Sequence, residues 1–278
     1  MKFAPIIYLI GMLLCILSAF MLVPALVDWY YKGDDWPAFI ASSLTTLFIG
    51  GGLFLSNRGS ATEHLELRQA FLLTNSAWIS IALCGSLPFL FSEINMSFTD
   101  AIFESTSGIT TTGATVIQNL ELTSHGILIW RALLQWLGGV GIIVMALAIL
   151  PMLSIGGMQL FKTESYETPE KVVPKAASFA AGISIVYITL TIIWALMLWG
   201  AGMPVFDSIA HSMTTLATGG YSTKSSSLAA FNSSYIELII IFGMIVGSLP
   251  FVHYLSITKN GWKNLINDDQ VKLFLSIV

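Results

Sequence analysis

Six long apolar runs constrain the fold more than any other feature of this sequence. A helix that crosses the hydrocarbon core of a bilayer needs about 20 consecutive apolar residues. Runs of about that length occupy roughly 3–27, 37–56, 69–91, 126–153, 177–199 and 235–257. Only 10% of the 278 residues are charged, whereas a soluble domain carries about 25%. The chain is therefore predicted to be an all-α membrane protein. The pattern excludes an ordinary soluble enzyme and a disordered chain, and the net charge of −4 excludes a nucleic-acid binder.

The lysines and arginines predict how these helices are oriented, because cytoplasmic loops are enriched in basic residues. If the N-terminus is cytoplasmic, nine of the twelve basic residues lie inside, Lys32 and Lys224 lie outside, and Arg131 falls within a run. Nine of the sixteen acidic residues then lie outside: Asp28, Asp34, Asp35, Glu93, Asp100, Glu104, Glu121, Asp207 and Glu237. We therefore expect a cytoplasmic N-terminus and an acidic outer surface that favours cations.

An internal repeat divides the chain. At an offset of 107 residues, identical residues coincide at Asp100/Asp207, Ile102/Ile209, Ser105/Ser212, Thr111/Thr218 and Gly113/Gly220. Each copy consists of an apolar run, a short segment with a Thr/Gly loop, and a second apolar run. We expect a leading two-helix unit at 1–60, a first repeat at 61–160, a second repeat at 161–260, and the beginning of a third at 261–278.

The segments that run from Asp100 and from Asp207 to the glycines are too short to cross a bilayer and return. They are predicted to be re-entrant half-helices that enter from the outer side, with the acid as N-cap. Their C-terminal ends would then direct carbonyl groups towards the membrane centre. Glycine permits the unusual backbone angles that a filter of inward-facing carbonyls needs. The predicted ligands of the ion are Thr111, Thr112, Gly113, Thr218, Gly219 and Gly220, with Thr110 and Ala217 next inward.

Three segments resemble a known family. Residues 104–115, ESTSGITTTGAT, resemble the first pore loop of the Trk/Ktr/HKT superfamily of potassium transporters. Residues 130–141, WRALLQWLGGVG, resemble the start of the pore-lining helix that follows, and 217–222, ATGGYS, are similar to the second pore loop. The two leading runs match the bacterial TrkH type. The sequence therefore predicts six transmembrane helices plus two re-entrant pore helices with filter loops.

The resemblance implies the channel-like membrane subunit of a potassium uptake system, without enzymatic activity. It further implies a multi-pass protein of the inner (cytoplasmic) membrane, one filter glycine per repeat, and K⁺ as transported ion with no bound cofactor. The implied partners are a second copy, in a homodimer, and a cytoplasmic nucleotide-binding regulatory subunit of the TrkA type; nucleic acid is not among them. Two features depart from the family. The family has four repeats and this chain has two, so a fragment is expected, and Gly219 stands where the first loop has Thr112.

Three other functions remain open at this point. The first is a truncated gene product that does not conduct. The second is a potassium/sodium or sodium-permeable transporter of the same superfamily; the family tends towards sodium when a filter glycine becomes serine, so Gly113 and Gly220 favour potassium. The third is a secondary transporter with broken helices, which predicts an inverted repeat.

Two features of the run at 126–153 have alternative explanations. Because a charge within the bilayer is costly, Arg131 either extends to the outer interface or forms a salt bridge with Glu104 that braces the first half-helix. The glycines at 138, 139 and 141 indicate either close helix packing or a hinge. The four histidines, His64, His125, His211 and His253, show no metal-binding spacing.

Overall fold

The computed structural model describes residues 3–60, 67–153, 172–251, 253–255 and 268–278, and every regular element in those ranges is a helix. The α-helices are α1 (Ala4–Phe20), α2 (Leu22–Tyr30), α3 (Trp36–Ser56), α4 (Leu67–Gly85), α5 (Leu87–Phe91), α6 (Phe98–Ile109), α7 (His125–Leu153), α9 (Val172–Gly200), α10 (Val205–Leu216), α11 (Ser234–Ser248) and α14 (Asp269–Ile277). Short 3₁₀ helices lie at Arg58–Ser60, Leu120–Leu122 and Ser227–Phe231. The prediction of an all-α protein is confirmed.

Four helical stretches in the described part of the chain are long and apolar enough to cross a membrane. They are Ala4–Tyr30, Trp36–Ser56, Arg68–Phe91 and Ala180–Gly200, and they coincide with four of the six predicted runs. The predicted run at 126–153 corresponds to the 29-residue helix α7. The predicted run at 235–257 corresponds to α11, which is shorter than expected at 15 residues. It ends at Ser248 because Pro250 disfavours a helical conformation at the residue before it, and Leu249 is extended with ψ of 146°.

Two of the predicted runs are interrupted by proline. Pro24 lies in the first turn of α2 and Pro88 in the first turn of α5. A proline has no N–H to donate to the residue four positions earlier, which is Phe20 in the first case and Cys84 in the second. The helix therefore breaks near the end of α1 and near the end of α4, and each apolar run becomes two consecutive helices.

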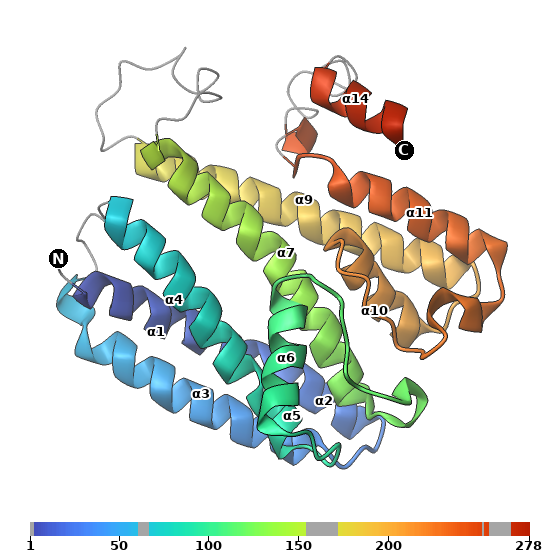
Figure 1. The fold of residues 1–278 in the computed structure, drawn as a ribbon, viewed down its shortest axis with the longest axis horizontal. Helices are drawn as coiled ribbons and strands as arrows, with labels where there is room; N and C mark the ends of the chain where they lie inside the picture. The colour runs from blue at the N-terminus through green and yellow to red at the C-terminus, as the bar shows by residue number, and fades with distance from the viewer. Residues whose placement is uncertain (1–2, 61–66, 154–171, 252, 256–267) are drawn as a thin grey trace.

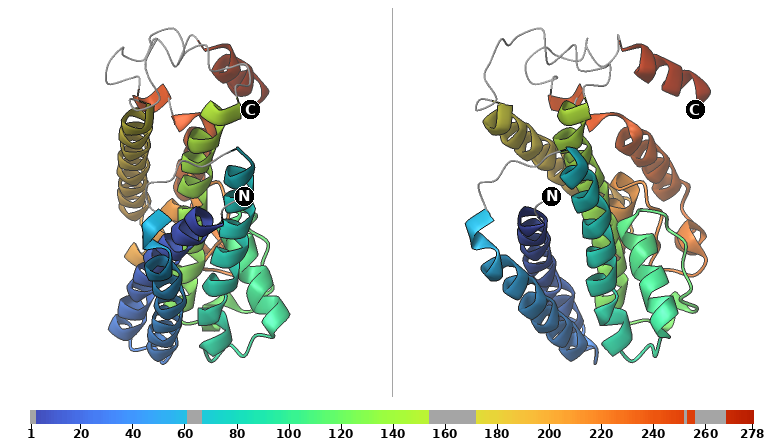
Figure 2. Two further views of the ribbon diagram at one scale, coloured as in Figure 1. Left: turned by 90° about the vertical axis from the view of Figure 1, so that its left-hand side faces the viewer. Right: turned by 60° about the vertical axis from the view of Figure 1, so that its left-hand side comes forward.

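Helix α7 lies at the centre of the arrangement (Figure 1). It contacts α2, α4, α6, α9 and α10. Helices α1, α2 and α3 pack together on one side of it, and α9, α10 and α11 pack together on the other. Figure 2 shows the same separation from two further directions. Because α6 and α10 both pack on α7, this helix determines how the two short helices lie relative to each other.

Two acids expected on the outer surface are buried instead. Asp28 is 0% exposed, and its carboxylate accepts hydrogen bonds from the backbone N–H groups of Gly126, at 3.0 Å, and Asp35, at 2.9 Å. Asp35 is also buried, and it accepts hydrogen bonds from the N–H of Glu93 and the hydroxyl of Ser124. Neither carboxylate therefore contributes to the expected acidic surface. Asp28 satisfies a backbone donor at the start of α7, and Asp35 accepts from the Ser124 hydroxyl directly before it, where a negative charge complements the helix dipole.

Candidate ion-binding site

The two short helices α6 and α10, which correspond to the predicted half-helices, begin with different caps. The hydroxyl of Ser97 accepts a hydrogen bond from the backbone N–H of Asp100, at 3.1 Å, so Ser97 is the N-cap of α6. Pro204 occupies the same position in α10, and Asp207 lies three residues later. The prediction that the two acids are the N-caps is therefore wrong by three positions. Both acids still lie in the first helical turn, where a carboxylate is favourable next to the positive end of the helix dipole.

Helix α6 runs alongside α7 in the same direction. The Nε atom of Arg131 lies 2.7 Å from Oε1 of Glu104, in the middle of α6. Two turns later along α7, a Cβ on Gly138 would collide with the carbonyl oxygen of Ile109, the last residue of α6. A side chain at position 138 would therefore not fit, because the C-terminal end of α6 lies against α7 there. This is the close-packing explanation for that glycine.

Helix α10 follows α7 in the same way on the other side. The ring centroids of Phe206, near the start of α10, and His125, at the start of α7, are 4.6 Å apart. At the other end, a Cβ on Gly139 would lie 3.1 Å from Cα of Ala217. Both half-helices thus end at neighbouring glycines of α7. At 1.5 Å per residue, Gly138 lies about 20 Å along α7 from the first residue of that helix, His125. They run in the same direction, whereas an inverted repeat would run them in opposite directions.

The loops that follow the half-helices have the same backbone conformation. Thr111 has φ of 56° and Thr218 has φ of 54°, and the glycines two positions later, Gly113 and Gly220, have φ of 79° and 78°. A β-branched residue with positive φ is an outlier. Such strain persists where the surrounding structure imposes it, and it gathers at functional sites. The repeat detected in the sequence is thus present in the backbone.

Each loop folds back onto its own half-helix. The carbonyl oxygen of Ser107 accepts hydrogen bonds from the N–H groups of Thr112, at 2.9 Å, and Gly113, at 3.4 Å. The carbonyl oxygen of Thr214 accepts from the residues at the equivalent positions of the second loop, at the same two distances. The N–H groups of both loops therefore point towards the helices that precede them.

The carbonyl groups of the same residues have no such partners. Within the described part of the chain, the carbonyl oxygens of residues 110–113 and 217–220 accept no hydrogen bond. Backbone carbonyls at membrane depth are tolerated only where protein, water or an ion satisfies them. These two stretches contain all six residues predicted as ligands of the ion, together with Thr110 and Ala217. Eight carbonyl oxygens thus have no hydrogen-bond partner among the described residues.

The two loops are in direct contact. A Cβ on Gly113 would collide with the carbonyl oxygen of Gly219. In addition, the hydroxyl of Tyr221, directly after the second loop, donates to the carbonyl oxygen of Glu104, at 3.0 Å. The structure therefore brings together two segments that are about a hundred residues apart in the sequence.

Glu104 and Arg131 form the charged centre behind the first loop. The two side chains are 0% and 1% exposed, so Arg131 does not extend to an interface and is paired. Thr115 donates its hydroxyl to the same carboxylate, at 2.9 Å, and Arg131 Nη1 donates to the carbonyl oxygen of Ser222, at 3.1 Å. The ion pair thus links the first half-helix, α7 and both loops.

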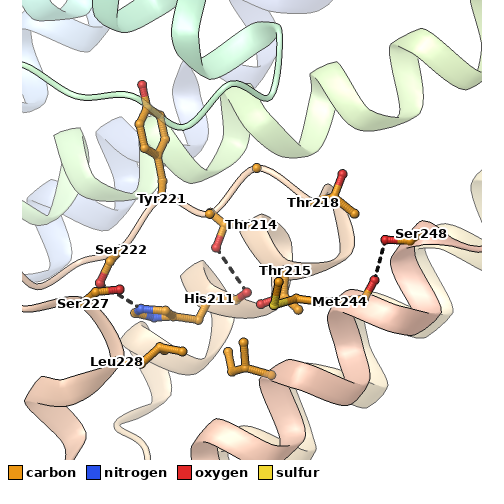
Figure 3. A pocket seen from close by; sticks show the side chains of 13 residues that line it. His211, Thr214, Thr215, Thr218, Tyr221, Ser222, Ser227, Leu228, Met244 and Ser248 are labelled. Atoms are coloured by element: carbon orange, nitrogen blue, oxygen red, sulfur yellow. Dashed lines mark hydrogen bonds between the residues drawn. The ribbon is translucent and has the colours of Figure 1, made fainter. Parts of the chain in front are cut away.

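The second repeat has a counterpart of this arrangement, with a histidine and a serine in place of the glutamate and the threonine. His211 and Ser222 occupy the repeat positions of Glu104 and Thr115, and His211 Nε2 lies 3.1 Å from the hydroxyl of Ser222 (Figure 3). His211 Nδ1 lies 2.8 Å from the carbonyl oxygen of Asp207, to which it must donate. Both ring nitrogens therefore have partners inside the protein. The described residues contain no group of three or more His, Cys, Asp or Glu side chains that could hold a metal ion.

A cavity of about 290 Å³ lies beside the second loop, on the side of α11. Thr218, Gly219 and Gly220 line it, together with His211 and Ser248. In Figure 3 the side chain of Tyr221 points away from the other labelled residues, towards the green ribbons of the first repeat. The second loop thus has one face on the first repeat and one face on an open, partly polar space.

The TrkH family model, described as a cation transport protein, matches residues 36–276. The chain belongs to the TrkH family. The predicted membership of this family of transporters is thereby confirmed, and the family consists of transport proteins rather than enzymes.

Individual TrkH-family members are similar over the whole chain. The Trk system potassium uptake protein TrkH of Salmonella typhimurium is 40% identical over 281 residues, which cover 100% of this chain and 58% of the relative. TrkG of Escherichia coli is 34% identical, over 97% of this chain and 56% of its own length. The crystal structure of the potassium transporter TrkH from Vibrio parahaemolyticus superposes with a TM-score of 0.89 at 38% identity, and covers 100% of this chain and 57% of that chain. The chain thus spans a little over half the length of these relatives.

Two residues at the site were not found from the sequence. Tyr221 and Gln135 both reach the contact between the loops, and Tyr221 N–H donates to Gln135 Oε1, at 3.1 Å. The sequence does contain a signal for Gln135, because it is a second polar residue one helical turn after Arg131 in an apolar run. Polar residues in such runs are costly and face protein or water.

Proposed function

We propose that this chain forms part of a potassium uptake pathway, in which Thr111, Thr112, Gly113, Thr218, Gly219 and Gly220 bind K⁺ through main-chain oxygens. One observation supports this most strongly. Two loops with the same strained backbone lie in contact and present carbonyl groups that have no partner among the described residues. Potassium filters are built from rings of such carbonyls, which replace the hydration shell of the ion.

The half-helices favour a cation at the same place. The C-terminal end of a helix carries about half a negative charge, and both C-terminal ends meet α7 at Gly138 and Gly139. Inward movement of one positive charge down the membrane potential yields about 2.3 kcal/mol per 100 mV. Uptake through such a path therefore needs no chemical reaction in this chain.

We further propose six transmembrane helices and two re-entrant helices, in the units 1–60, 61–160 and 161–260 with a further unit beginning at 261. Helix α7, with 29 residues, is about 43 Å long at 1.5 Å per residue, which exceeds the roughly 30 Å of a bilayer core. The distribution of basic residues supports a cytoplasmic N-terminus, with the loops opening outward, in the cytoplasmic membrane.

The named relatives are components of Trk systems, which supports a membrane subunit that acts with other components. We propose a homodimer and a cytoplasmic nucleotide-binding subunit of the TrkA type as those partners. A sodium-permeable transporter stays the second candidate, because the unpartnered carbonyls suit any alkali cation.

The test is transport by the intact protein in bacteria that lack their own potassium uptake systems. We expect growth at low external K⁺ and Rb⁺ uptake that excess Na⁺ does not abolish. Gly220→Ser places a side chain on the second loop and is expected to reduce the preference for Rb⁺ over Na⁺. Gly52→Ser is the control, because nothing lies within 4 Å of a Cβ added at Gly52 in α3. Absence of Rb⁺ uptake, or equal uptake of Na⁺ by the unaltered protein, would contradict the proposal.

A further inference from the structure

The side chain of Gln135 lies next to the contact between the two loops. Its side chain projects from α7, one turn after Arg131, and it is 0% exposed. Its Oε1 atom accepts a hydrogen bond from the backbone N–H of Tyr221, at 3.1 Å. Because Tyr221 directly follows Gly220, this bond fixes the outgoing end of the second loop to α7.

The amide of Gln135 also explains why the second loop has a glycine at 219. Gly219 is absent from the residues with positive φ, so its backbone angles do not require glycine. A Cβ on Gly219 would instead collide with Cδ and Oε1 of Gln135, and it would lie 2.7 Å from Nε2. The first loop has Thr112 at the equivalent position. The side-chain amide of Gln135 therefore fills the space that a side chain at 219 would need.

The other end of the amide faces the first loop. A Cβ on Gly113 would lie 3.6 Å from Nε2 of Gln135. This Nε2 atom is buried and has no hydrogen-bond partner within the described part of the chain. A buried donor without a partner is costly, so the position of this amide needs a reason besides the stability of α7.

We propose that Gln135 is the positioning residue that sets the separation of the two loops, and with it the preference for K⁺ over the smaller Na⁺. The inference rests on the proposed function of the loops. The amide packs against Gly219 and faces Gly113 beside the direct contact of the two loops, and its hydrogen bond from the N–H of Tyr221 keeps the carbonyl oxygens from closing around a smaller ion. Selectivity in carbonyl filters is attributed either to the size of the cage or to the number and strength of its carbonyl dipoles, and Gln135 acts through the first of these.

The test compares Gln135→Ala, Gly219→Ala and the double variant in the intact protein, reconstituted in liposomes and assayed for Rb⁺ and Na⁺ uptake. Gln135→Ala removes the packed amide and one anchoring hydrogen bond, and we expect the Rb⁺/Na⁺ uptake ratio to fall roughly 3- to 10-fold. Gly219→Ala forces a methyl group into the amide, and we expect Rb⁺ uptake to be lost. In the double variant the space is free again, and Rb⁺ uptake should return to the level of Gln135→Ala.

Gly141→Ala, on the same helix with nothing within 4 Å of the added Cβ, is the control and should transport like the unaltered protein. If Gln135→Ala does not fold, Gln135→Asn withdraws the amide by one methylene and should show the same fall in ratio. An unchanged ratio, or a double variant no better than Gly219→Ala, overturns this inference alone. Absence of Rb⁺ uptake by the unaltered protein overturns the proposed function instead.

Discussion

The hydroxyl of Tyr221 donates to the backbone carbonyl oxygen of Glu104, at 3.0 Å, across 117 residues of sequence. The guanidinium carbon of Arg131 lies 4.1 Å from the centroid of the Tyr221 ring, within the range of a cation–π interaction. The second loop is therefore anchored on the half-helix of the first repeat. This contact fixes the position of the second loop relative to the first.

Replacing Tyr221 by Phe removes the hydroxyl and keeps the ring over Arg131. We expect the free energy of unfolding to fall by about 0.5–1.5 kcal/mol, the usual contribution of one hydrogen bond. Thermal unfolding in detergent measures this change, and the Rb⁺/Na⁺ uptake ratio should fall with it. A ratio equal to that of the unaltered protein would show that the hydroxyl does not position the loop.

The buried ion pair predicts a larger effect. Arg131→Gln leaves the carboxylate of Glu104 buried without its charged partner, and breaking such a pair costs about 3–5 kcal/mol. We expect much less folded protein, measured by size-exclusion chromatography. The control is Asp269→Asn, which breaks the exposed pair with Lys272 and should have almost no effect.

The double variant Glu104→Gln with Arg131→Gln separates charge from packing. It removes both buried charges, so it should be more stable than Arg131→Gln alone, although two changes are made. A double variant that is less stable than either single variant would contradict the assignment of a buried ion pair.

The loop glycines Gly113 and Gly220 should differ in their tolerance of alanine. Both have positive φ, so Gly113→Ala and Gly220→Ala each incur about 1–2 kcal/mol of backbone strain. Only the Cβ at 113 collides with the other loop, because nothing lies within 4 Å of the Cβ at 220. We expect Gly220→Ala to yield folded protein with reduced Rb⁺/Na⁺ discrimination and Gly113→Ala to yield little folded protein. Equal yields would show that the loops are not in contact.

The glycines of α7 give a comparison within one helix. Gly138→Ala forces a methyl group against the carbonyl oxygen of Ile109, and overpacking costs typically about 1–3 kcal/mol. Gly141→Ala meets no atom within 4 Å, and alanine is favoured over glycine in a helix by about 1 kcal/mol. Thermal unfolding should show destabilisation in the first variant and none in the second. A hinge at Gly138 would instead show impaired transport with unchanged stability.

A hydrogen-bonded contact between Glu121 and Ser225, in the segments that follow the two loops, depends on pH. The hydroxyl and the backbone N–H of Ser225 donate to Glu121, and these hydrogen bonds lower the pKa of its carboxyl below the ordinary 4.5. A lowered pKa means that the stabilisation is present above pH 4.5 and is lost as the pH falls through the lower value. We expect the protection factor of the Ser225 amide, which corrects for the intrinsic pH dependence of hydrogen exchange, to fall in that acidic window, and to show no such change in Glu121→Gln. A protection factor that is the same at all pH values would contradict this contact.

The sequence predicted the helices well where apolar runs are uninterrupted, and less well at their ends. Pro24 and Pro88 break two runs, and Pro250 ends α11 early, because the missing N–H and the restricted preceding residue are local effects. The acids of the half-helices were misplaced as N-caps, because Ser97 and Pro204 cap three residues earlier. These differences follow from the local preferences of proline and serine, which act within a few residues along the chain.

The contacts that position the loops could not be predicted in the same way. Tyr221 meets Gln135 across 86 residues and Glu104 across 117, and no periodicity in the sequence encodes such a pairing. The burial of Asp28 likewise depends on the start of α7, 98 residues away. The repeat indicated which residues are equivalent, whereas the packing of α6 and α10 on α7 determines which of them meet.

Anomalous scattering from rubidium tests the central claim most directly. Crystals of the intact protein grown with Rb⁺ in place of K⁺ should show an anomalous difference peak beside the carbonyl oxygens of residues 111–113 and 218–220. Crystals grown with Na⁺ alone should show none there. Rubidium peaks elsewhere in the protein, with none beside these oxygens, would contradict the account.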